Sequence, residues 1–506
     1  MKSVTVTGDA LVAADVVAVA QRRATAELGS GVADRMEGAR RVVADAVARG
    51  AVVYGITTGF GALASTRVAP EESAAMQVAL LRSHAAGVGA PLGDEQVRAM
   101  LLLRARTLAQ GHSGVRVEVV QRLLDMLRLD MLPVVPGQGS VGASGDLAPF
   151  AHLALPVIGE GEVRVGGAVL PAAEALRAAG LEPLVLQPKE GLSLLNGTEG
   201  MLAMLVLALD RAHRIISAAD LAAALSIEAL LGSERPFAAA VHALRPHPGQ
   251  AASARRIRHA LEGSGIVSSH RHDFDHAVQD AYSLRCAPQV HGAAADVLGF
   301  ADAVAGRELG AVVDNPIVFP DTGEVVSAGN FHGEPLAFAL DFSAIAIAEV
   351  ASISERRTDR ILDPARSAGL PPFLATRPGL DSGYMIAQYT AAALVAENRV
   401  LCHPASVDSI PTSGLQEDHV SMGWGAGRKL GAVLDNSVRV VAVELLCAAE
   451  GVERRAPLRP GAGTAAVHSA VRSVVPPLEH DRPPGPAIEA IAAMVEAGGL
   501  DAIAAR

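Results

Sequence analysis

The sequence predicts a mostly α-helical protein, in which a long-helix bundle follows a smaller N-terminal domain with a glycine-rich loop. Of the 506 residues 50% are hydrophobic but only 3% are aromatic, so the core has to be aliphatic and rich in alanine. Alanine in this quantity favours helices that pack closely against one another. Apolar stripes at helical spacing with few breakers also run through five long segments, 200–232, 274–310, 336–362, 383–402 and 421–453. These segments are roughly two to three times as long as an average helix, which is typical of a bundle.

Shorter elements precede the long helices. Glycine and proline mark their ends, because glycine is a common helix stop and proline disfavours helix at the residue before it. In chain order we expect two helices within 10–50 and then a short strand or extended piece over 52–61 that opens a glycine loop. Helices follow from about 70 to 130, with breaks at 83–89 and 111–114. A small hairpin with a short helix is expected over 160–190.

The pattern divides the chain into three parts. Residues 1–199 form the N-terminal domain that bears the glycine-rich loop, and residues 200–455 form the long-helix bundle. Within the bundle, 312–335 predicts a short β-ribbon around Asp321-Thr322-Gly323. Residues 456–506 are rich in proline and glycine, so we expect a tail with a helix that wraps the surface.

Composition and charge exclude several classes of protein. A formal net charge of -11 argues against nucleic-acid binding, which needs a basic surface. The 3 cysteines, Cys286, Cys402 and Cys447, have no metal-like spacing and indicate a reducing compartment without structural disulfides. The N-terminal residues show no signal-peptide pattern, and the apolar run at 201–209 is too short to span a bilayer. We therefore expect a cytoplasmic protein with no nucleic-acid or membrane partner.

The rest of the chain is organised around the stretch 136–152, Pro-Gly-Gln-Gly-Ser-Val-Gly-Ala-Ser-Gly-Asp-Leu-Ala-Pro-Phe-Ala-His. Its glycines allow the backbone conformations that other residues cannot adopt. In such a loop the amide nitrogen of Gly145 can attack the carbonyl of Ala143 and close a five-membered ring. Loss of water from the ring and from the Ser144 side chain then leaves an exocyclic methylidene, a strong electrophile that no unmodified side chain supplies.

The run Gly-Ser-Val-Gly-Ala-Ser-Gly-Asp-Leu-Ala-Pro at 139–149 resembles the signature of the aromatic amino acid ammonia-lyases and aminomutases. The resemblance extends in matching order from about 50 to 465. It implies the ammonia-lyase (fumarase/aspartase-like) fold and a 4-methylidene-imidazol-5-one (MIO) group formed autocatalytically from Ala143, Ser144 and Gly145. It implies no external cofactor and no metal, and a homotetramer in which each site is built from several subunits.

Other interpretations of this loop explain less. The run 137–142 fits the Gly-x-Gly-x-x-Gly dinucleotide pattern, but Pro133 and Pro136 stand where the preceding strand belongs and no βαβ alternation surrounds it. Ser144 as a hydrolase nucleophile would need a Gly-x-Ser-x-Gly elbow, which is missing. An ordinary glycine loop would explain the triplet alone but not its flanking residues.

Tyr54 and Asn196, both in the predicted N-terminal domain, match active-site residues of the family. Tyr54, in Tyr-Gly-Ile-Thr-Thr-Gly-Phe-Gly, would by itself be a packing tyrosine, but the resemblance makes it the base at the substrate β-carbon. A phenol with an ordinary pKa of about 10 needs nearby positive charge or hydrogen-bond donors to act as a phenolate. Asn196, in Leu-Leu-Asn-Gly-Thr, would otherwise be a turn residue. Its family counterpart lies against the MIO and the substrate amine, and Thr57 is a departure because family members often carry Asn there.

Gln279, Tyr282 and Arg285 recur at intervals of three, and on a helix or its end they would share a face. A solvated polar face would show the same pattern. The resemblance assigns the substrate carboxylate to Arg285, for which a guanidinium fork is suited, and the MIO neighbourhood to Tyr282 and Gln279. Phe331 would ordinarily be a core residue, but its counterpart packs next to the MIO ring. Gly333 departs mildly from the family, where many members carry Ala.

Two polar residues indicate the substrate. His84, in Ser-His-Ala-Ala-Gly, and Glu417, in Gln-Glu-Asp-His-Val-Ser-Met-Gly, correspond to pocket residues that face the substrate ring. Alone, each would be an ordinary surface or satisfied polar group, but together in an apolar pocket they can hydrogen-bond both nitrogens of an imidazole. The second motif is characteristic of histidine ammonia-lyases. The resemblance therefore implies the conversion of L-histidine to trans-urocanate and ammonia, the first step of histidine degradation, with Glu417 and Tyr282 among the catalytic residues.

Alternatives stay open at this point. A tyrosine ammonia-lyase or an aminomutase of the same family would share the triplet, Tyr54 and Arg285, and a non-catalytic helical scaffold or binding protein is a remote alternative. The run His270-Arg271-His272-Asp273-Phe274-Asp275-His276 resembles a metal cluster in composition. No family motif covers it, and a solvated loop is the interpretation we favour.

Overall fold

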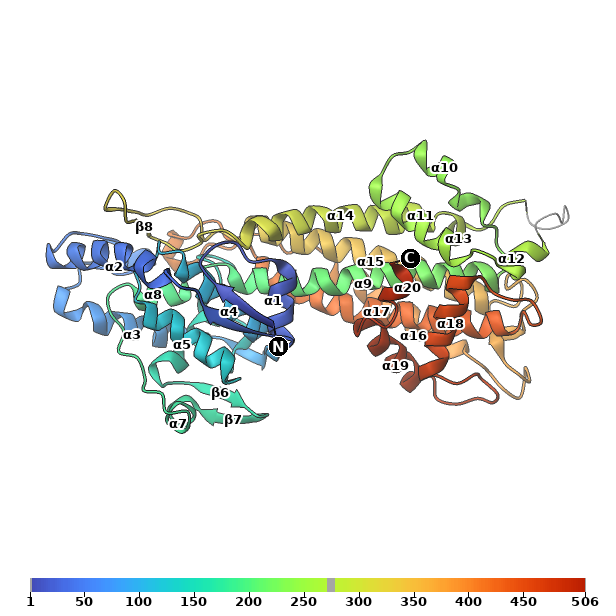
Figure 1. Cartoon of the computed structure of the whole chain (residues 1–506), viewed down its shortest axis with the longest axis horizontal. Helices are drawn as coiled ribbons and strands as arrows, with labels where there is room; N and C mark the ends of the chain where they lie inside the picture. The colour runs from blue at the N-terminus through green and yellow to red at the C-terminus, as the bar shows by residue number, and fades with distance from the viewer. Residues whose placement is uncertain (1, 271–277, 506) are drawn as a thin grey trace. The chain divides into compact units, whose positions relative to one another are not determined.

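The computed structural model of the chain describes residues 2–270 and 278–505 (Figure 1). It is mostly α-helical, which confirms the predicted fold class. The histidine-rich run is described only at His270, and the rest of it lies outside the described residues.

The chain folds into two compact units, each made of discontinuous segments. Unit 1 comprises Met1–Leu207, Asp302–Leu340 and Ala405–Arg428, and unit 2 comprises Ala208–Ala301, Asp341–Pro404 and Lys429–Arg506. Neither unit is a continuous stretch of chain, so the units do not correspond to the three predicted parts and do not test them. The division into 1–199, 200–455 and 456–506 stays a prediction.

The predicted long segments are helices in the structure, with shifted ends. They are α9 (Glu199–Ala229), α14 (Ala287–Glu308), α15 (Glu334–Leu362), α16 (Met385–Leu401) and α17 (Gly423–Glu453). The expected start of the second helix at 274 is wrong for the described residues from 278 on, where a separate short helix, α13 (Tyr282–Arg285), precedes α14. Pro288 explains where α14 begins, because proline has no N–H to donate and is favoured in the first turn of a helix.

Unit 1 contains short helices and small sheets. Its helices, besides the ends of the long ones, are α1 (Ala13–Ala20), α2 (Val32–Ala48), α3 (Ser73–His84), α4 (Asp94–Ala109), α5 (Val117–Arg128), α6 (Leu147–Ala154), α7 (Ala172–Ala178) and α8 (Glu190–Leu195). Short 3₁₀ helices occur at Gly61–Leu63, Pro70–Glu72, Leu155–Ile158 and Ser413–Leu415. Helix α4 is the core element, since every residue from 97 to 109 is buried.

Strand pairs connect distant parts of unit 1. Strands β1 (Lys2–Val6) and β2 (Ala24–Leu28) pair in parallel. The other pairs are antiparallel: β3 (Val88–Pro91) pairs with β5 (Pro136–Gln138), and β8 (Ile317–Phe319) pairs with β9 (Glu324–Val326). In a sheet of three strands, β6 (Glu162–Val165) lies between β4 (Leu132–Pro133) and β7 (Ala168–Pro171). The hairpin of β6 and β7 followed by α7, and the ribbon of β8 and β9, confirm two predictions. The pairing of β3 with β5 positions the start of the glycine-rich loop.

The segment 52–61, expected to be a short strand or extended piece, forms no strand. This segment is a series of turns in which only Thr58 forms an isolated bridge, to Arg67. Thr57 explains the turns, because its hydroxyl donates to the Ala51 carbonyl at 2.5 Å and accepts the Val53 N–H at 3.0 Å. Such local bonds between side chain and backbone compete with strand formation.

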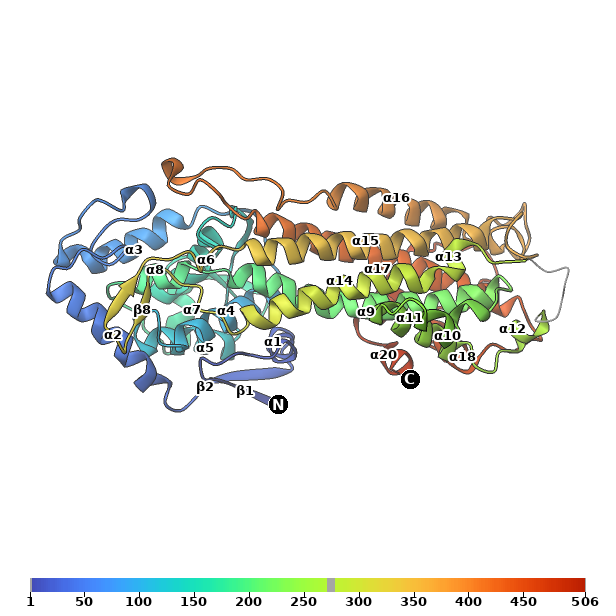
Figure 2. The ribbon, with the colours of Figure 1, turned by 90° about the horizontal axis from the view of Figure 1, so that it is seen from above.

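Within unit 2 the long helices run alongside one another (Figures 1 and 2). Glu444 of α17 joins three of them, since its buried carboxylate accepts hydrogen bonds from Ser226 of α9 at 2.6 Å and from Ser354 of α15 at 2.7 Å. Arg357 of α15 forms an ion pair with the same carboxylate at 2.5 Å. A buried charge is tolerated here because it is both paired and hydrogen-bonded.

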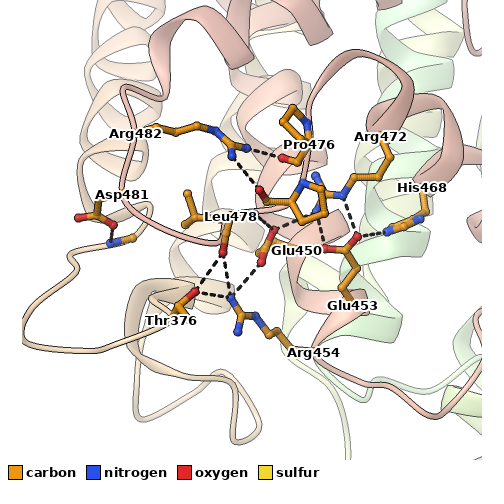
Figure 3. A network of polar contacts seen from close by, with 12 residues as sticks. Thr376, Glu450, Glu453, Arg454, His468, Arg472, Pro476, Leu478, Asp481 and Arg482 are labelled. Carbon is orange, nitrogen blue, oxygen red and sulfur yellow. Dashed lines mark hydrogen bonds and ion pairs between the residues drawn. The ribbon is translucent and has the colours of Figure 1, made fainter.

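The smaller helices of unit 2 include most of the C-terminal residues, which are more helical than the expected tail. They are α10 (Ala239–Ala243), α11 (Pro248–Ala260), α12 (Gly265–Ser269), α18 (Ala462–Val474), α19 (Gly485–Glu496) and α20 (Asp501–Ala504), with 3₁₀ turns at Arg235–Phe237 and Pro372–Leu374. Figure 3 shows the ion pairs that tie α18 to α17, in which Arg472 contacts Glu450 at 2.9 Å and Glu453 at 2.8 Å. His468 contacts the same Glu453 at 3.0 Å.

Among the described helices, α15 alone is long and apolar enough to cross a membrane by length and composition. Of the most apolar 18-residue window of α15, 67% is buried inside the structure. A core helix of a soluble protein passes the same test, so α15 gives little reason to infer a membrane span.

Candidate active site

A cavity of about 720 Å³ opens in unit 1. Its wall contains five of the residues that the sequence singled out, Tyr54, His84, Ser144, Asn196 and Glu417. Much of the remaining wall is apolar, with leucine, methionine and phenylalanine side chains. A largely apolar cavity with a few convergent polar groups is the usual form of a small-molecule site.

Hydrogen bonds hold the glycine-rich loop on both sides of the Ala143-Ser144-Gly145 triplet. Before it, the Val141 carbonyl accepts the Met422 N–H at 2.9 Å, and after it, the Asp146 N–H donates to the Gly197 carbonyl at 2.8 Å. Neither the Gly145 N–H nor the Ala143 carbonyl forms a hydrogen bond with any residue that the structure describes. The two groups that would react in a cyclisation are therefore not held by hydrogen bonds, although the loop is anchored on both sides of them.

Position 145 requires glycine, both for its backbone conformation and for the space around it. Its φ of +73° is in the left-handed region that L side chains rarely adopt, and an added Cβ would overlap the Gly197 carbonyl oxygen. The loop thus approaches the turn at Gly197 too closely to leave room for a side chain at position 145.

Asp146 ends the loop at the start of two helices. It precedes α6, and its Oδ2 accepts the Met201 N–H in the first turn of α9 at 2.9 Å. The carboxyl is fully buried, and burial raises its pKa to about 8 although the Met201 and Gly200 N–H groups act in the opposite direction. Its Oδ1 has no partner among the described residues. Asp146 is therefore mostly protonated at neutral pH.

Glu417 reaches the triplet from a tight turn. The backbones of Thr412 and Glu417 form an isolated bridge, and the Thr412 hydroxyl donates to Glu417 Oε2 at 2.7 Å. The other oxygen, Oε1, accepts a long hydrogen bond from Ser144 Oγ at 3.4 Å. This turn presents the carboxylate beside the serine of the triplet.

His84 is the last residue of α3 and lies half-buried in the same cavity. Its Nδ1 is 3.0 Å from Ser83 Oγ. Burial lowers the pKa of the imidazole, and the opposing effects of the Leu80 backbone and the Glu417 charge are smaller. His84 is thus a neutral imidazole at neutral pH, able to donate from one nitrogen and accept at the other.

Tyr54 is held by its own loop. Its hydroxyl accepts the Gly61 N–H at 3.1 Å, and its ring packs edge-on against Phe60 with centroids 6.4 Å apart. Burial raises the pKa of the phenol, as does the charge of Glu417, and the Gly61 N–H only partly offsets this. Among the described residues, the cavity wall includes no lysine or arginine that would stabilise a phenolate.

Asn196 follows α8 and presents an unused acceptor. Its side-chain N–H donates to the Asn315 carbonyl at 2.8 Å, while its buried Oδ1 has no partner among the residues described. A ligand with an N–H group could supply that partner. Leaving the acceptor unpaired costs about 1–3 kcal/mol.

A sequence family described as aromatic amino acid lyase matches residues 11–473. The chain belongs to the aromatic amino acid lyase family.

Relatives of known name agree with this membership, and the histidine ammonia-lyases among them are carbon–nitrogen lyases. The histidine ammonia-lyase of Anaeromyxobacter sp. (strain K) is 52% identical over 508 residues, covering 99% of this chain and 100% of its own. The crystal structure of histidine ammonia-lyase from Trypanosoma cruzi has a TM-score of 0.92 and 42% identity, covering 100% of this chain and 95% of that one. The tyrosine aminomutase from Streptomyces globisporus has a TM-score of 0.94 and 38% identity, covering 100% and 98%.

Three residues that the lyase resemblance assigned to the site lie in unit 2 and do not line the cavity. Arg285 donates from Nε to the Asp280 carbonyl at 2.9 Å, and its guanidinium stacks over the Tyr282 ring at 4.7 Å. Tyr282 is 72% exposed, and Gln279 is exposed. Gln279 precedes α13, so only Tyr282 and Arg285 share that helix.

Phe331 is half-buried in unit 1 and does not line the cavity. Beside it, His332, Glu334 and His419 have potential metal-ligand atoms within 4.8 Å of one another. Both nitrogens of His332 already have contacts at 3.3 Å, because Nδ1 accepts the Glu334 N–H and Nε2 lies against the His419 carbonyl. An ion at this cluster would have to displace one of them.

Asn315 and Ser413 also line this lyase cavity, and neither was predicted as a site residue from the sequence. Asn315 fixes the Asn196 amide, and the Ser413 hydroxyl accepts the Ala62 N–H at 3.1 Å. The Asn-Pro pair at 315–316 signals a turn from sequence alone, but nothing in it indicates which side chain the turn would contact.

Proposed function

We propose that this lyase converts L-histidine to trans-urocanate and ammonia without oxidation, as the first step of histidine degradation. The observation that carries the proposal is the presence of His84 and Glu417 in one largely apolar cavity with Ser144. The neighbouring relatives of the chain that are named histidine ammonia-lyases support the same substrate.

The polar pair fits an imidazole ring. Glu417 can accept the ring N–H, and the neutral His84 can donate to the other ring nitrogen. Leucine and phenylalanine side chains would cover the apolar edges of the substrate. A phenol or phenyl ring would leave at least one of these two polar groups without a partner, which disfavours tyrosine and phenylalanine.

The geometry of the loop suits an MIO group made from Ala143, Ser144 and Gly145, with no external cofactor. The Gly145 nitrogen and the Ala143 carbonyl are free of hydrogen bonds to described residues, while the loop is tied down on both sides. Once formed, the group supplies an electrophile for the substrate amine. The chain's own residues hold the rest of the substrate.

In this proposal Asn196 orients the amine through its unpaired Oδ1, and Tyr54 removes a β-proton. Because burial raises the pKa of Tyr54, the phenol needs a cation close by before it can act as a base. The substrate ammonium and Arg285 are the cations that the proposal provides. Arg285 also binds the substrate carboxylate, Tyr282 orients the amine together with Asn196, and Gln279 and Phe331 complete the surroundings of the triplet.

We further propose that the chain acts as a homotetramer in which each site is built from several subunits. This arrangement supplies the residues assigned to the site that do not line the cavity of unit 1, namely Gln279, Tyr282 and Arg285. The free state of Cys286, Cys402 and Cys447 fits a cytoplasmic location, which we also propose.

A panel of substrates tests the function. The purified protein is mixed separately with L-histidine, L-tyrosine and L-phenylalanine, and ultraviolet product formation and ammonium release are recorded. We expect urocanate and ammonium from L-histidine alone. The similarity to a tyrosine aminomutase makes that activity the second candidate, and product from L-tyrosine instead of L-histidine would overturn the assignment of His84 and Glu417.

A further inference from the structure

Three arginines of α4 are buried in unit 1, and each has a different set of partners. Arg98 donates to the Val19 and Leu127 carbonyls, and Arg106 to the Asp9 and Ala311 carbonyls. Arg104, with no exposed surface, is the one whose contacts lie at the turn between α8 and α9, to which the triplet loop is hydrogen-bonded. An arginine is seldom fully buried unless its charge is paired and its N–H groups are satisfied.

The Arg104 guanidinium joins two helix ends. Its Nη1 donates to the Ser193 carbonyl at 2.8 Å and to the Asn196 carbonyl at 3.1 Å, at the C-terminal end of α8. Its Nη2 donates to the Asn196 carbonyl at 3.2 Å and forms an ion pair with Glu199, the first residue of α9. The turn between these helices, 196–198, is therefore held at both ends by one side chain.

That turn is the surface on which the triplet loop rests. Its first residue, Asn196, lines the cavity, and the Gly197 carbonyl accepts the Asp146 N–H at 2.8 Å. A Cβ on Gly197 would overlap the Arg104 guanidinium, so the turn and the arginine lie in direct contact. On the other side, Arg104 stacks over the ring of Phe150 in α6, the helix that starts just after the loop, at 5.1 Å.

We propose that Arg104 is a positioning residue for formation of the MIO group, acting through the Asn196–Gly197 turn. The inference rests on the proposed function. In the cyclisation the Gly145 nitrogen bonds to the Ala143 carbonyl carbon, and the carbonyl oxygen leaves as water with the amide hydrogens of Gly145 and Ser144. The Ser144 hydroxyl leaves as a second water with its own Cα hydrogen. No redox partner is needed, so the contribution of the protein is to hold the reacting atoms together.

Holding the 196–198 turn in this way requires the planar guanidinium group of an arginine. Arg104 contacts two carbonyls, one carboxylate and one aromatic face at once, and a lysine ammonium can keep the charge opposite Glu199 but not this geometry. Arg104→Lys therefore preserves the buried ion pair and removes the fork. Arg106→Lys is the matched control, because it changes an equally buried arginine of the same helix whose carbonyl partners lie elsewhere.

The experiment measures the mass of the peptide that spans 143–145 in natively folded wild type, Arg104→Lys and Arg106→Lys, together with kcat and KM for L-histidine. We expect wild type and Arg106→Lys to lack two waters. In Arg104→Lys less than about half of the peptide should be dehydrated, with kcat lowered in proportion and KM within about twofold. A merely structural role would lower the yield of folded protein without changing the dehydrated fraction of what folds.

Two results would overturn the inference. One is full dehydration with wild-type kcat in Arg104→Lys, and the other is an equal loss of dehydration in both variants. If Arg104→Lys does not fold, Gly197→Ala tests the same contact from the turn, and full dehydration there would count equally against us. An undehydrated wild-type peptide would instead contradict the proposed function itself.

Discussion

At the scale of single residues, burial sets the protonation of the groups around the triplet. It raises the pKa of Asp146 to about 8, raises that of Tyr54, and lowers that of His84. The site is thus prepared with a protonated acid behind the loop and a neutral imidazole in the cavity. The sequence indicated Tyr54 and His84 as site residues but gave no role to Asp146, and the protonation of all three depends on burial, which the sequence does not show.

Glu417→Gln tests the recognition of the imidazole. Loss of the carboxylate should lower kcat/KM for L-histidine about 10- to 100-fold, equivalent to about 1.4–2.8 kcal/mol for a charge-assisted hydrogen bond. The peptide at 143–145 should remain dehydrated. Asp418→Asn, which removes the adjacent exposed carboxylate, is the control and should keep wild-type kinetics. Equal effects of the two substitutions would contradict the role of Glu417.

The buried Asp146 predicts a pH dependence of stability. Its folded-state pKa of about 8 lies above the ordinary 3.8, so the folded chain retains a proton that the unfolded chain loses. The stabilisation is present below 3.8 and is lost as pH rises through about 8. We expect the melting temperature of wild type, relative to Asp146→Asn, to fall between about pH 5 and about pH 9. Parallel curves, or a difference that grows with pH, would show that Asp146 is not protonated in the fold.

At the level of helices and loops, the glycine-rich loop is held by hydrogen bonds to two neighbouring segments. Met422 binds it before the triplet, and Gly197 binds it after the triplet. Helix boundaries were largely predictable from apolar spacing and from glycine and proline, as for α3, α4 and α15. The turn at 52–61 was not, because the Thr57 hydroxyl satisfies backbone groups that a strand would have used. Nor could the sequence show that Asn315 holds the Asn196 amide, because that contact joins segments more than a hundred residues apart.

Gly145→Ala tests the close approach of loop and turn. The added Cβ meets the Gly197 carbonyl, so we expect loss of stability and no dehydration at the triplet. Gly180→Ala is a matched control, since Gly180 has a similar φ of +70° with nothing within 4 Å. It should cost only about 1 kcal/mol, the usual penalty of the left-handed region, and leave the triplet dehydrated. Thermal melting and peptide mass measure both effects, and a fully dehydrated Gly145→Ala would be incompatible with this packing.

At the scale of the whole molecule, fold class and family could be predicted from the sequence because the long apolar stripes and the loop motif are both local patterns. The two compact units could not, since they combine distant segments. The site residues divide in the same way, with Tyr54, His84, Asn196 and Glu417 in the cavity and Arg285 in the other unit. Light scattering should therefore find a tetramer, and an active monomer would contradict the proposed assembly.

The buried carboxylate of Glu444 predicts how the long helices of unit 2 are held. Glu444→Gln leaves Arg357 without a charged partner, which should cost about 3–5 kcal/mol and lower the melting temperature. Glu489→Gln is the control, because its pair with Arg439 is exposed and should contribute at most about 1 kcal/mol. A Glu444 variant as stable as the Glu489 variant would exclude this role.

Urocanate formation from L-histidine, measured side by side for wild type and Ser144→Ala, tests whether the triplet supplies the electrophile. Ser144→Ala cannot form the methylidene, yet it changes only one hydroxyl, whose hydrogen bond to Glu417 is a long one. We predict rapid urocanate formation by wild type and almost none by a well-folded variant. Wild-type turnover in Ser144→Ala would contradict the account, because the electrophile would then have to come from elsewhere.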